Sequence, residues 1–382
     1  MRSIAGGLNN KTCIENVSRI LGLSGEEELE ELPHWDTINE YLKKLEPTEI
    51  ERIIPKLVYR LTRMRTFENS KIRKKYWQVV VDGTHLYTFK ERHCEHCCVR
   101  EFRDKSGEIT RTEYYHAVLE AKLLLLESIV ISIATEFIEN EKVEVTKQDC
   151  ELNAFYRMAE KFKRQFPRLP ICLTMDSLYA CGPVFKLCKR YGWHYIIRFK
   201  DGSMKTVSED FHALKDIEPK QSWTKINQES KKTTQTYKYV LKISYQSYEL
   251  NAVEFTQSDL PHPFVFITDL SISRRNCEKL VEYGRLRWKI ENEGFNIQKN
   301  HGLGICHLFC KNYTAIKNHY FLIQISHMIV QLLEIGLKSL TALSKMATKQ
   351  IVEALRESFR VEPLTEEDEA IVNRRFQYRF RC

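Results

Sequence analysis

The order of apolar segments between residues 76 and 202 constrains the fold of this chain more than any other feature. Three segments rich in β-branched and aromatic residues come first, each typical of a buried strand: WQVVVDGTHLYTF (77–89), YYHAVLEAKLLLL and SIVISIATEFI. A helical segment (147–166), a short strand (171–176), a second helix near 180–191 and a strand at 193–200 are predicted to follow. Three strands followed by helix, strand, helix and strand is the order of a ribonuclease-H-like α/β core, which is the fold that we expect.

The regions that flank this core differ from it in composition. Residues 1–75 are polar and place their apolar residues at helical spacing, so we expect a helical N-terminal region. Residues 203–262 alternate polar and apolar residues with period two, which indicates a β-rich insertion within the core. We therefore expect the first part of the core at 76–202, its completion at 263–310 and a C-terminal helical region at 311–382.

Charge and hydropathy are compatible with a DNA partner and argue against a membrane protein. Lys and Arg exceed Asp and Glu by 59 to 51, and the resulting net charge of +8 fits a polyanionic partner as well as simple solubility. The N-terminus lacks a signal-peptide pattern, and charged or polar residues interrupt the most apolar segments. The 12 cysteines are irregularly spaced, so we expect reduced thiols in a cytoplasmic protein without membrane segments.

Acidic residues end the apolar runs of two predicted strands. Asp82 follows VVV, and Asp176 follows LTM. The end of a buried strand holds a side chain rigidly while exposing it to ligand. A third acid, Glu291, lies in a predicted helix on the same face as Arg287. Such residues often form only turns or surface ion pairs, but three converging carboxylates would make an all-oxygen site suited to Mg²⁺ or Mn²⁺.

A different kind of site is suggested by KERHCEHCCVRE (90–101). Cys94 and Cys97 have the spacing of a zinc knuckle, but they supply only two of the four ligands that a structural zinc site requires. A second group follows the predicted helix with Glu291 and comprises Cys306, His307 and Cys310. The alternatives are a zinc ion that bridges the two groups and unligated residues in turns. Because thiolates select zinc rather than Mg²⁺, neither group is expected to be the catalytic centre.

Three segments together resemble a known enzyme family: DGTHLYTFKE, LTMDSLYACGPVF and RLRWKIENEGFN. In this order, with β-rich sequence between the second and the third, they are similar to bacterial insertion-sequence transposases with a catalytic Asp–Asp–Glu (DDE) triad. The most similar subgroup carries a β-rich insertion before the Glu and a Tyr–Arg–Glu–Lys signature on its last catalytic helix. The resemblance covers roughly residues 75–340.

The resemblance implies a role for each matching acid. Asp82 and Asp176 match the two catalytic Asp residues, and Glu291 matches the Glu; all three would bind Mg²⁺ or Mn²⁺. Glu293 is the alternative third acid, two residues further along the chain. The spacing from Arg287 favours Glu291.

The same resemblance implies which residues contact DNA. Arg287 matches the Arg of the signature, whereas Tyr283 and Lys299 match it only loosely. The family places the Tyr three residues before the Arg and the Lys seven after the Glu, but the corresponding gaps here are four and eight. All three residues are expected near a DNA phosphate.

The resemblance also implies a reaction and its partners. It predicts cut-and-paste transposition, in which two protomers bind terminal inverted repeats, hydrolyse the phosphodiester at each end and join the freed 3′-hydroxyl to target DNA. The helical region 1–75 would then bind DNA, and the protein would act in the bacterial cytoplasm on nucleoid DNA. The alternatives are a metal-dependent nuclease of the same fold without strand transfer, and a zinc-stabilised DNA-binding protein whose acids are structural.

Overall fold

The computed structural model of the chain describes residues 8–373, apart from 127, 142, 144–146, 218, 228–232, 309, 339–345 and 347. The chain divides into two compact units. One unit is the continuous segment Phe67–Ile297, and the other combines Met1–Thr66 with Gln298–Cys382. The five regions expected from the sequence divide the chain more finely and stay a prediction.

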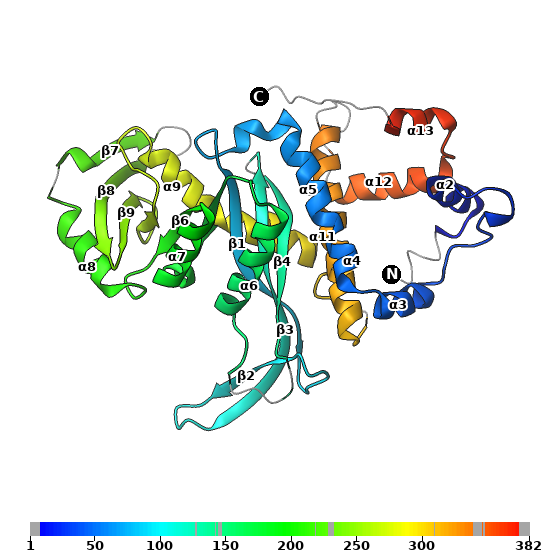
Figure 1. Cartoon of the computed structure of the whole chain (residues 1–382), viewed down its shortest axis with the longest axis horizontal. Coiled ribbons are helices and arrows are strands. Elements are labelled where there is room, and N and C mark those ends of the chain that lie inside the picture. The colour runs from blue at the N-terminus through cyan, green and yellow to red at the C-terminus, as the bar shows by residue number, and fades with distance from the viewer. Residues whose placement is uncertain are drawn as a thin grey trace. The chain divides into compact units, whose positions relative to one another are not determined.

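The continuous unit is built on a mixed sheet whose centre has the predicted ribonuclease-H-like arrangement (Figure 1). Its five central strands lie in the order β4-β3-β1-β5-β6. β3 runs antiparallel to β4 and β1, whereas β1, β5 and β6 are parallel. The bounds are β1 Trp77–Phe89, β3 Ile109–Leu125, β4 Ile129–Ile138, β5 Ile171–Met175 and β6 His194–Phe199.

Helices cover both faces of this central sheet. The helices α6 (Glu151–Gln165) and α7 (Gly182–Tyr191) lie on one face (Figure 1). On the other face α9 (Cys277–Arg285) is followed by a 3-10 turn (Leu286–Trp288) and a π-helix (Ile290–Asn296). The sequence predicted a helix that carries Glu291; the structure has a helical segment of changing pitch there.

The sheet continues beyond β6 with strands from the segment 203–270. β10 (Phe264–Thr268) pairs antiparallel with β6, and β9 (Tyr248–Gln257), β8 (Thr233–Tyr245) and β7 (Ser222–Asn227) follow in that order. The period-two alternation in this segment therefore reflects strands with one buried face. The helix α8 (Lys205–Leu214) precedes them and was not expected from the sequence.

At the opposite edge of the sheet, β2 (Cys98–Arg103) pairs with the first half of β3 as a hairpin. Figure 1 shows this hairpin extending away from α6 and the centre of the sheet. The strand β2 was not predicted, because three of the six residues in its sequence CVREFR are charged and only Cys98 is fully buried.

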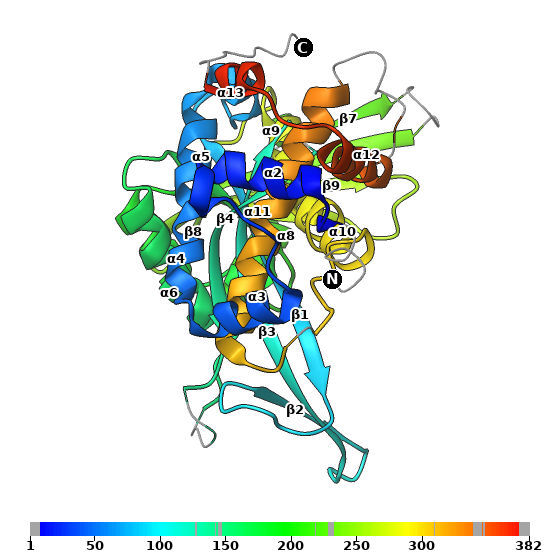
Figure 2. The same ribbon diagram turned by 90° about the vertical axis from the view of Figure 1, so that its right-hand side faces the viewer.

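The second unit is helical. α11 packs against α3 and α4, and α2 packs against α12 (Figure 2). Asn318 of α11 donates a hydrogen bond to the carbonyl oxygen of Leu42 at 2.8 Å, which ties α11 to the end of α3. None of the described helices is long and apolar enough to cross a bilayer. The bounds are α2 Lys11–Leu21, α3 Trp35–Lys44, α4 Pro47–Glu51, α5 Ile53–Arg63, α10 Ile297–Asn300 at the junction, α11 Tyr313–Lys338, α12 Thr348–Val361 and α13 Glu366–Asn373.

Candidate active site

The side chains on one face of β1 hold the helical segment that carries Arg287 and Glu291. Successive residues of a strand point to opposite faces, so Gln78, Val80 and Asp82 share a face. Gln78 Nε2 donates to the carbonyl oxygen of Tyr283 at 2.7 Å, and Val80 packs with Ile290 and Phe295. Asp82 Oδ2 accepts from Arg287 Nη1 at 3.0 Å. Residues on one face of β1 therefore contact α9, the 3-10 turn and the π-helix.

The register of the parallel pair brings the two predicted Asp residues to the same level of the sheet. Val80 of β1 pairs with Thr174 of β5, and Asp82 and Asp176 each lie two residues further along the chain from that pair. Adjacent strands are about 4.8 Å apart, so the backbones of Asp82 and Asp176 are neighbours at the carboxyl ends of parallel strands.

The two Asp residues differ in their local backbone. The expectation that Asp82 ends its strand is wrong: β1 continues to Phe89, because its pairing with β3 persists after the parallel partner β5 has ended. Asp176 does follow its strand directly, and it caps the 3-10 turn Ser177–Tyr179 by accepting a hydrogen bond from the Leu178 amide at 2.8 Å.

A single guanidinium joins the first and third predicted acids. Arg287 donates to Asp82 through Nη1 and to Glu291 through Nη2, each at 3.0 Å. Glu293, the alternative third acid, forms an ion pair with Lys289 at 3.2 Å instead. Glu291 is therefore the acid that shares a cation with Asp82, and Arg287 lies between their carboxylates.

The π-helix gives a physical account of the unusual spacing after Glu291. A π-helix holds about one more residue per turn than an α-helix, and such insertions often occur at functional sites. One extra residue separates Glu291 from Lys299 relative to the Tyr–Arg–Glu–Lys signature, and the π-helix Ile290–Asn296 begins just before Glu291 and covers most of this interval. Lys299 itself belongs to α10, beyond the boundary of the continuous unit, so its place near the acids stays a prediction.

A fourth carboxylate, Glu151, was missed by the sequence reasoning. It lies in the first turn of α6, where its Oε1 accepts a hydrogen bond from the Tyr179 hydroxyl at 2.7 Å. A Cβ atom on Gly83 would lie 2.8 Å from Glu151 Oε2, so this carboxylate packs on the backbone next to Asp82. An acid in the first turn of a helix is common, because it interacts well with the helix dipole, and so it gave no separate signal.

The electrostatics of the carboxylates reflect burial and the repulsion between neighbouring acids. Burial raises the pKa of Asp82 to about 7, Arg287 opposes this shift, and Glu291 and Glu151 add to it. The pKa of Glu151 is raised as well, mainly by burial and partly by Asp176, although the Tyr179 hydroxyl opposes this.

A basic pocket opens beside Asp176 and Arg287. Its cations are Arg198, Lys200 and Arg285, together with Arg287. The guanidinium carbon of Arg198 lies 4.2 Å from the centre of the Phe264 ring, and that of Arg285 lies 5.5 Å from the same ring. Trp288 also lines the pocket and is 52% exposed. The sequence offered no reason to group these residues, because they come from β6, β10 and the α9 segment.

Tyr283 takes part in the packing of the α9 segment, a role that the signature did not imply. Its side chain is half-buried against the apolar cluster that contains Phe266, Leu280 and Val281. Its carbonyl oxygen accepts the hydrogen bond from Gln78. A DNA contact by its hydroxyl stays a prediction.

Gly284 sets how closely the α9 segment approaches the sheet. A Cβ atom there would lie 2.6 Å from the ring of Phe266, which is buried. We expect Gly284→Ala to destabilise the protein by about 1–3 kcal/mol, because the ring and the helix must separate. Gly202→Ala is the matched control, since no atom lies within 4 Å of its added Cβ, and it should change stability by less than about 0.5 kcal/mol. Urea unfolding of both variants measures the difference; equal midpoints would contradict the close approach.

The predicted zinc ligands fall into two groups that belong to different units. Cys94 and Cys97 lie in the turn between β1 and β2, where they meet His93 and His116. Cys306, His307 and Cys310 belong to the helical unit, and a bridge from them to Cys94 and Cys97 stays a prediction. In the described part of the chain, the four-residue His–Cys group is the only set of three or more His, Cys, Asp or Glu whose ligand atoms all lie within 4.8 Å of one another.

The continuous unit has a ribonuclease-H-like fold with acidic residues near the carboxyl ends of its parallel strands, and its family match implies a nucleic-acid-processing enzyme. The sequence model of the family described as "Transposase DDE domain" matches residues 73–329, which is more than half of the chain. This chain therefore belongs to the DDE-domain transposases of insertion sequences, as the sequence resemblance implied. No curated protein matches the chain.

Proposed function

We propose that this transposase catalyses cut-and-paste transposition, with Asp82, Asp176 and Glu291 as its catalytic triad. The observation that carries the proposal is that Arg287 contacts both Asp82 of β1 and Glu291 of the α9 segment, while the parallel register of β1 and β5 supports a place for Asp176 beside them. Two protomers would bind the terminal inverted repeats in the bacterial cytoplasm and act on nucleoid DNA. The N-terminal helices would contribute to recognition of the ends.

The residues present fit a hard divalent cation. The carboxylates of Asp82, Asp176, Glu291 and Glu151 interact electrostatically here, Arg287 contacts two of them, and burial has raised the pKa values of Asp82 and Glu151. Oxygen ligands suit Mg²⁺ or Mn²⁺. Asp82, Asp176 and Glu291 would hold the metal, and Glu151 is available as a further oxygen ligand. When bound, the metal activates the attacking hydroxyl and stabilises the leaving oxygen.

Arg287 would exchange its partners when DNA binds. In the structure its guanidinium forms ion pairs with both Asp82 and Glu291. Once the carboxylates hold a divalent cation, the guanidinium is free to contact a DNA phosphate, for which its fork-like geometry is well suited. This exchange is consistent with the place of Arg287 at the edge of the basic pocket.

The basic pocket would position the DNA end beside the carboxylates. Lys200 and Arg285 are exposed cations there, and the exposed ring of Trp288 offers a surface on which an unpaired base can stack. We expect Lys200→Ala and Arg285→Ala each to lower the affinity for end DNA and to reduce the slope of log affinity against log salt by about 1. Fluorescence anisotropy at several salt concentrations measures this.

Lys186→Ala is the matched control for that experiment. Lys186 is an exposed lysine of α7 outside the pocket, so its removal should leave the slope unchanged. If the control lowers the slope as much as the two pocket variants, the DNA path does not follow the pocket. Arg287→Ala belongs in the same series; an unchanged slope would leave Arg287 as a structural partner of the carboxylates.

The experiment that tests the proposed function uses the DNA ends that flank the gene. Purified protein should cleave them in Mg²⁺ and join the freed 3′-hydroxyl ends to a target plasmid. Cleavage without joining would instead identify a nuclease of the same fold, and binding without cleavage a DNA-binding protein whose acids are structural. Short inverted repeats around the gene, flanked by a target duplication, would support the transposase independently.

A further inference from the structure

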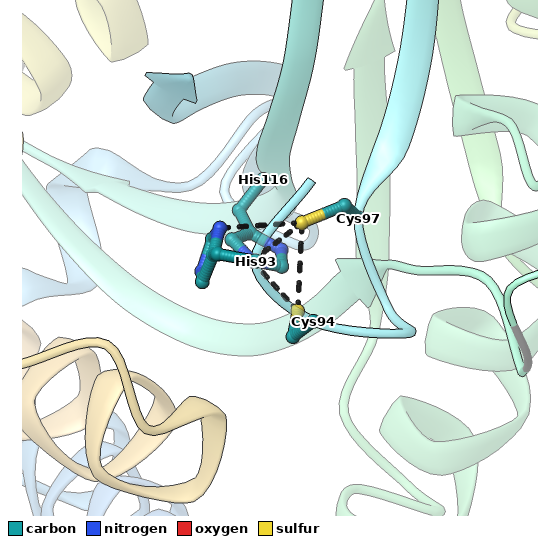
Figure 3. Close-up of side chains that lie close together, drawn as sticks. All are labelled: His93, Cys94, Cys97 and His116. Atoms are coloured by element: carbon teal, nitrogen blue, oxygen red, sulfur yellow. Dashed lines mark hydrogen bonds between the residues drawn. The ribbon is translucent and has the colours of Figure 1, made fainter. Parts of the chain in front are cut away.

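The turn after β1 and the middle of β3 bring two thiols and two imidazoles together. His93, Cys94 and Cys97 come from the turn, and His116 comes from β3, where it pairs with Tyr87 of β1. Figure 3 shows the four side chains pointing toward one another. Their ligand atoms all lie within 4.8 Å of one another. The group lies within the continuous unit and shares no residue with the carboxylate cluster.

The distances within this group agree with those around a tetrahedral zinc ion. Zinc binds sulfur at about 2.3 Å and histidine nitrogen at about 2.0–2.1 Å, so a tetrahedron separates two sulfur ligands by about 3.8 Å and sulfur from nitrogen by about 3.6 Å. The Sγ atoms of Cys94 and Cys97 are 3.5 Å apart. Nε2 of His116 lies 3.4 Å from Sγ of Cys94 and 3.6 Å from Sγ of Cys97. Nδ1 of His93 lies 3.5 Å from Sγ of Cys97.

The surrounding structure holds the turn in this arrangement. Two side chains donate hydrogen bonds to the carbonyl oxygen of Cys97: Arg92 Nη1 at 3.1 Å and Asn140 Nδ2 at 3.0 Å. Cys97 and His116 are fully buried, whereas His93 and Cys94 are half-buried. The sheet therefore holds the buried residues Cys97 and His116 in place. The half-buried residues His93 and Cys94 leave a path for a metal to enter.

We propose that His93, Cys94, Cys97 and His116 bind one structural zinc ion. Four protein ligands complete the coordination of zinc, so the site has no open position for a water or a substrate. Its role is to fasten the turn to β3 and so to fix the base of the β2–β3 hairpin. The Mg²⁺ or Mn²⁺ expected at the carboxylates and this zinc ion occupy separate sites with different ligand chemistry.

This site differs from the bridge considered from the sequence alone. Cys94 and Cys97 needed two more ligands, and the sequence offered Cys306, His307 and Cys310 for them. The structure supplies His93 and His116 instead, so a complete zinc site needs no residue from the helical unit. His116 gave no signal in the sequence, because it lies inside a strand and far from the Cys–x–x–Cys pair.

The test is the metal content and stability of the full chain. Elemental analysis should find one zinc per chain in the wild type and at least a tenfold loss in Cys94→Ser and His93→Gln. These two positions are half-buried, which favours variants that still fold. Loss of the metal should lower Tm by more than about 5 °C. Wild-type protein loaded with Co²⁺ should show the d–d and thiolate charge-transfer bands of a tetrahedral site with two sulfur ligands.

Two cysteine controls separate this site from the alternatives. Cys98→Ser removes a buried neighbour whose Sγ lies 3.6 Å from the Ile138 carbonyl oxygen, and Cys310→Ser removes the ligand expected of a bridge. Both should keep the zinc. Loss of zinc in Cys310→Ser would overturn the four-ligand site in favour of the bridge. Metal-free wild-type protein with an unchanged Tm, or a Cys94–Cys97 disulfide in place of the metal, would overturn the zinc site altogether.

Discussion

Asp82→Asn, Asp176→Asn and Glu291→Gln are each expected to reduce end cleavage by about a thousandfold or more. Each change removes a negative oxygen from the metal site while keeping the size of the side chain. The loss of several kcal/mol of transition-state stabilisation corresponds to at least three powers of ten in rate. DNA affinity should change little, because no cation of the basic pocket is removed. Single-turnover cleavage and equilibrium binding measure the two effects separately.

Glu293→Gln is the matched control for the third acid. Glu293 lies two residues from Glu291 and pairs with Lys289, so its substitution should leave the cleavage rate within a few-fold of the wild type. An active Glu291→Gln variant together with an inactive Glu293→Gln variant would show that the third acid has been assigned to the wrong residue.

Asp82→Asn is also expected to stabilise the metal-free protein at neutral and alkaline pH. The pKa of Asp82 is about 7 in the folded protein, above its ordinary value of 3.8 in an unfolded chain. The folded state therefore retains a proton that the unfolded state releases, so the contribution of Asp82 to stability falls as pH rises from about 4 to 7. The amide that replaces this carboxyl group has no proton to lose in that range. The stability advantage of the variant should thus be smallest near pH 4 and largest above pH 7.

The size of this effect follows from the pKa difference. About three pKa units at 1.36 kcal/mol each set an upper limit of about 4 kcal/mol on the change in relative stability between pH 4 and pH 8. Urea unfolding of both proteins in EDTA measures it. Asp104→Asn is the control of opposite sign, because hydrogen bonds from Ser106 lower the pKa of exposed Asp104. A pH-independent difference between wild type and Asp82→Asn would contradict the raised pKa.

The central strands were predictable because buried strands have a recognisable local composition, rich in β-branched and aromatic residues. The segment 77–89, rich in β-branched and aromatic residues, is observed as β1, and the Asp176 strand ends where its apolar run ends. Asp82 shows the limit of this reasoning. A change from apolar to polar residues marks where the parallel neighbour ends, but an antiparallel neighbour on the other side carries the strand further.

The parts of the site that escaped prediction depend on tertiary pairing. In the sequence, Glu151 cannot be distinguished from other acidic residues at the start of a helix. His116 likewise cannot be distinguished from other residues within a long strand. Arg198 and Lys200 can be assigned to the basic pocket only from the fold, because β6 must lie next to β10 and the α9 segment to form it. The ion pair of Arg287 with Glu291 was foreseen from helical spacing, whereas its second bond to Asp82 required the fold.

The central claim is that Asp82 and Asp176 bind the catalytic metal, and metal rescue of cysteine variants tests it most directly. Thiolate is a poor ligand for Mg²⁺ but a better one for the softer Mn²⁺. We predict that Asp82→Cys and Asp176→Cys abolish end cleavage in Mg²⁺ and recover part of it in Mn²⁺, whereas Asp82→Ala and Asp176→Ala stay inactive in both. Undiminished Mg²⁺-supported cleavage by Asp82→Cys and Asp176→Cys would contradict the assignment of these acids as metal ligands.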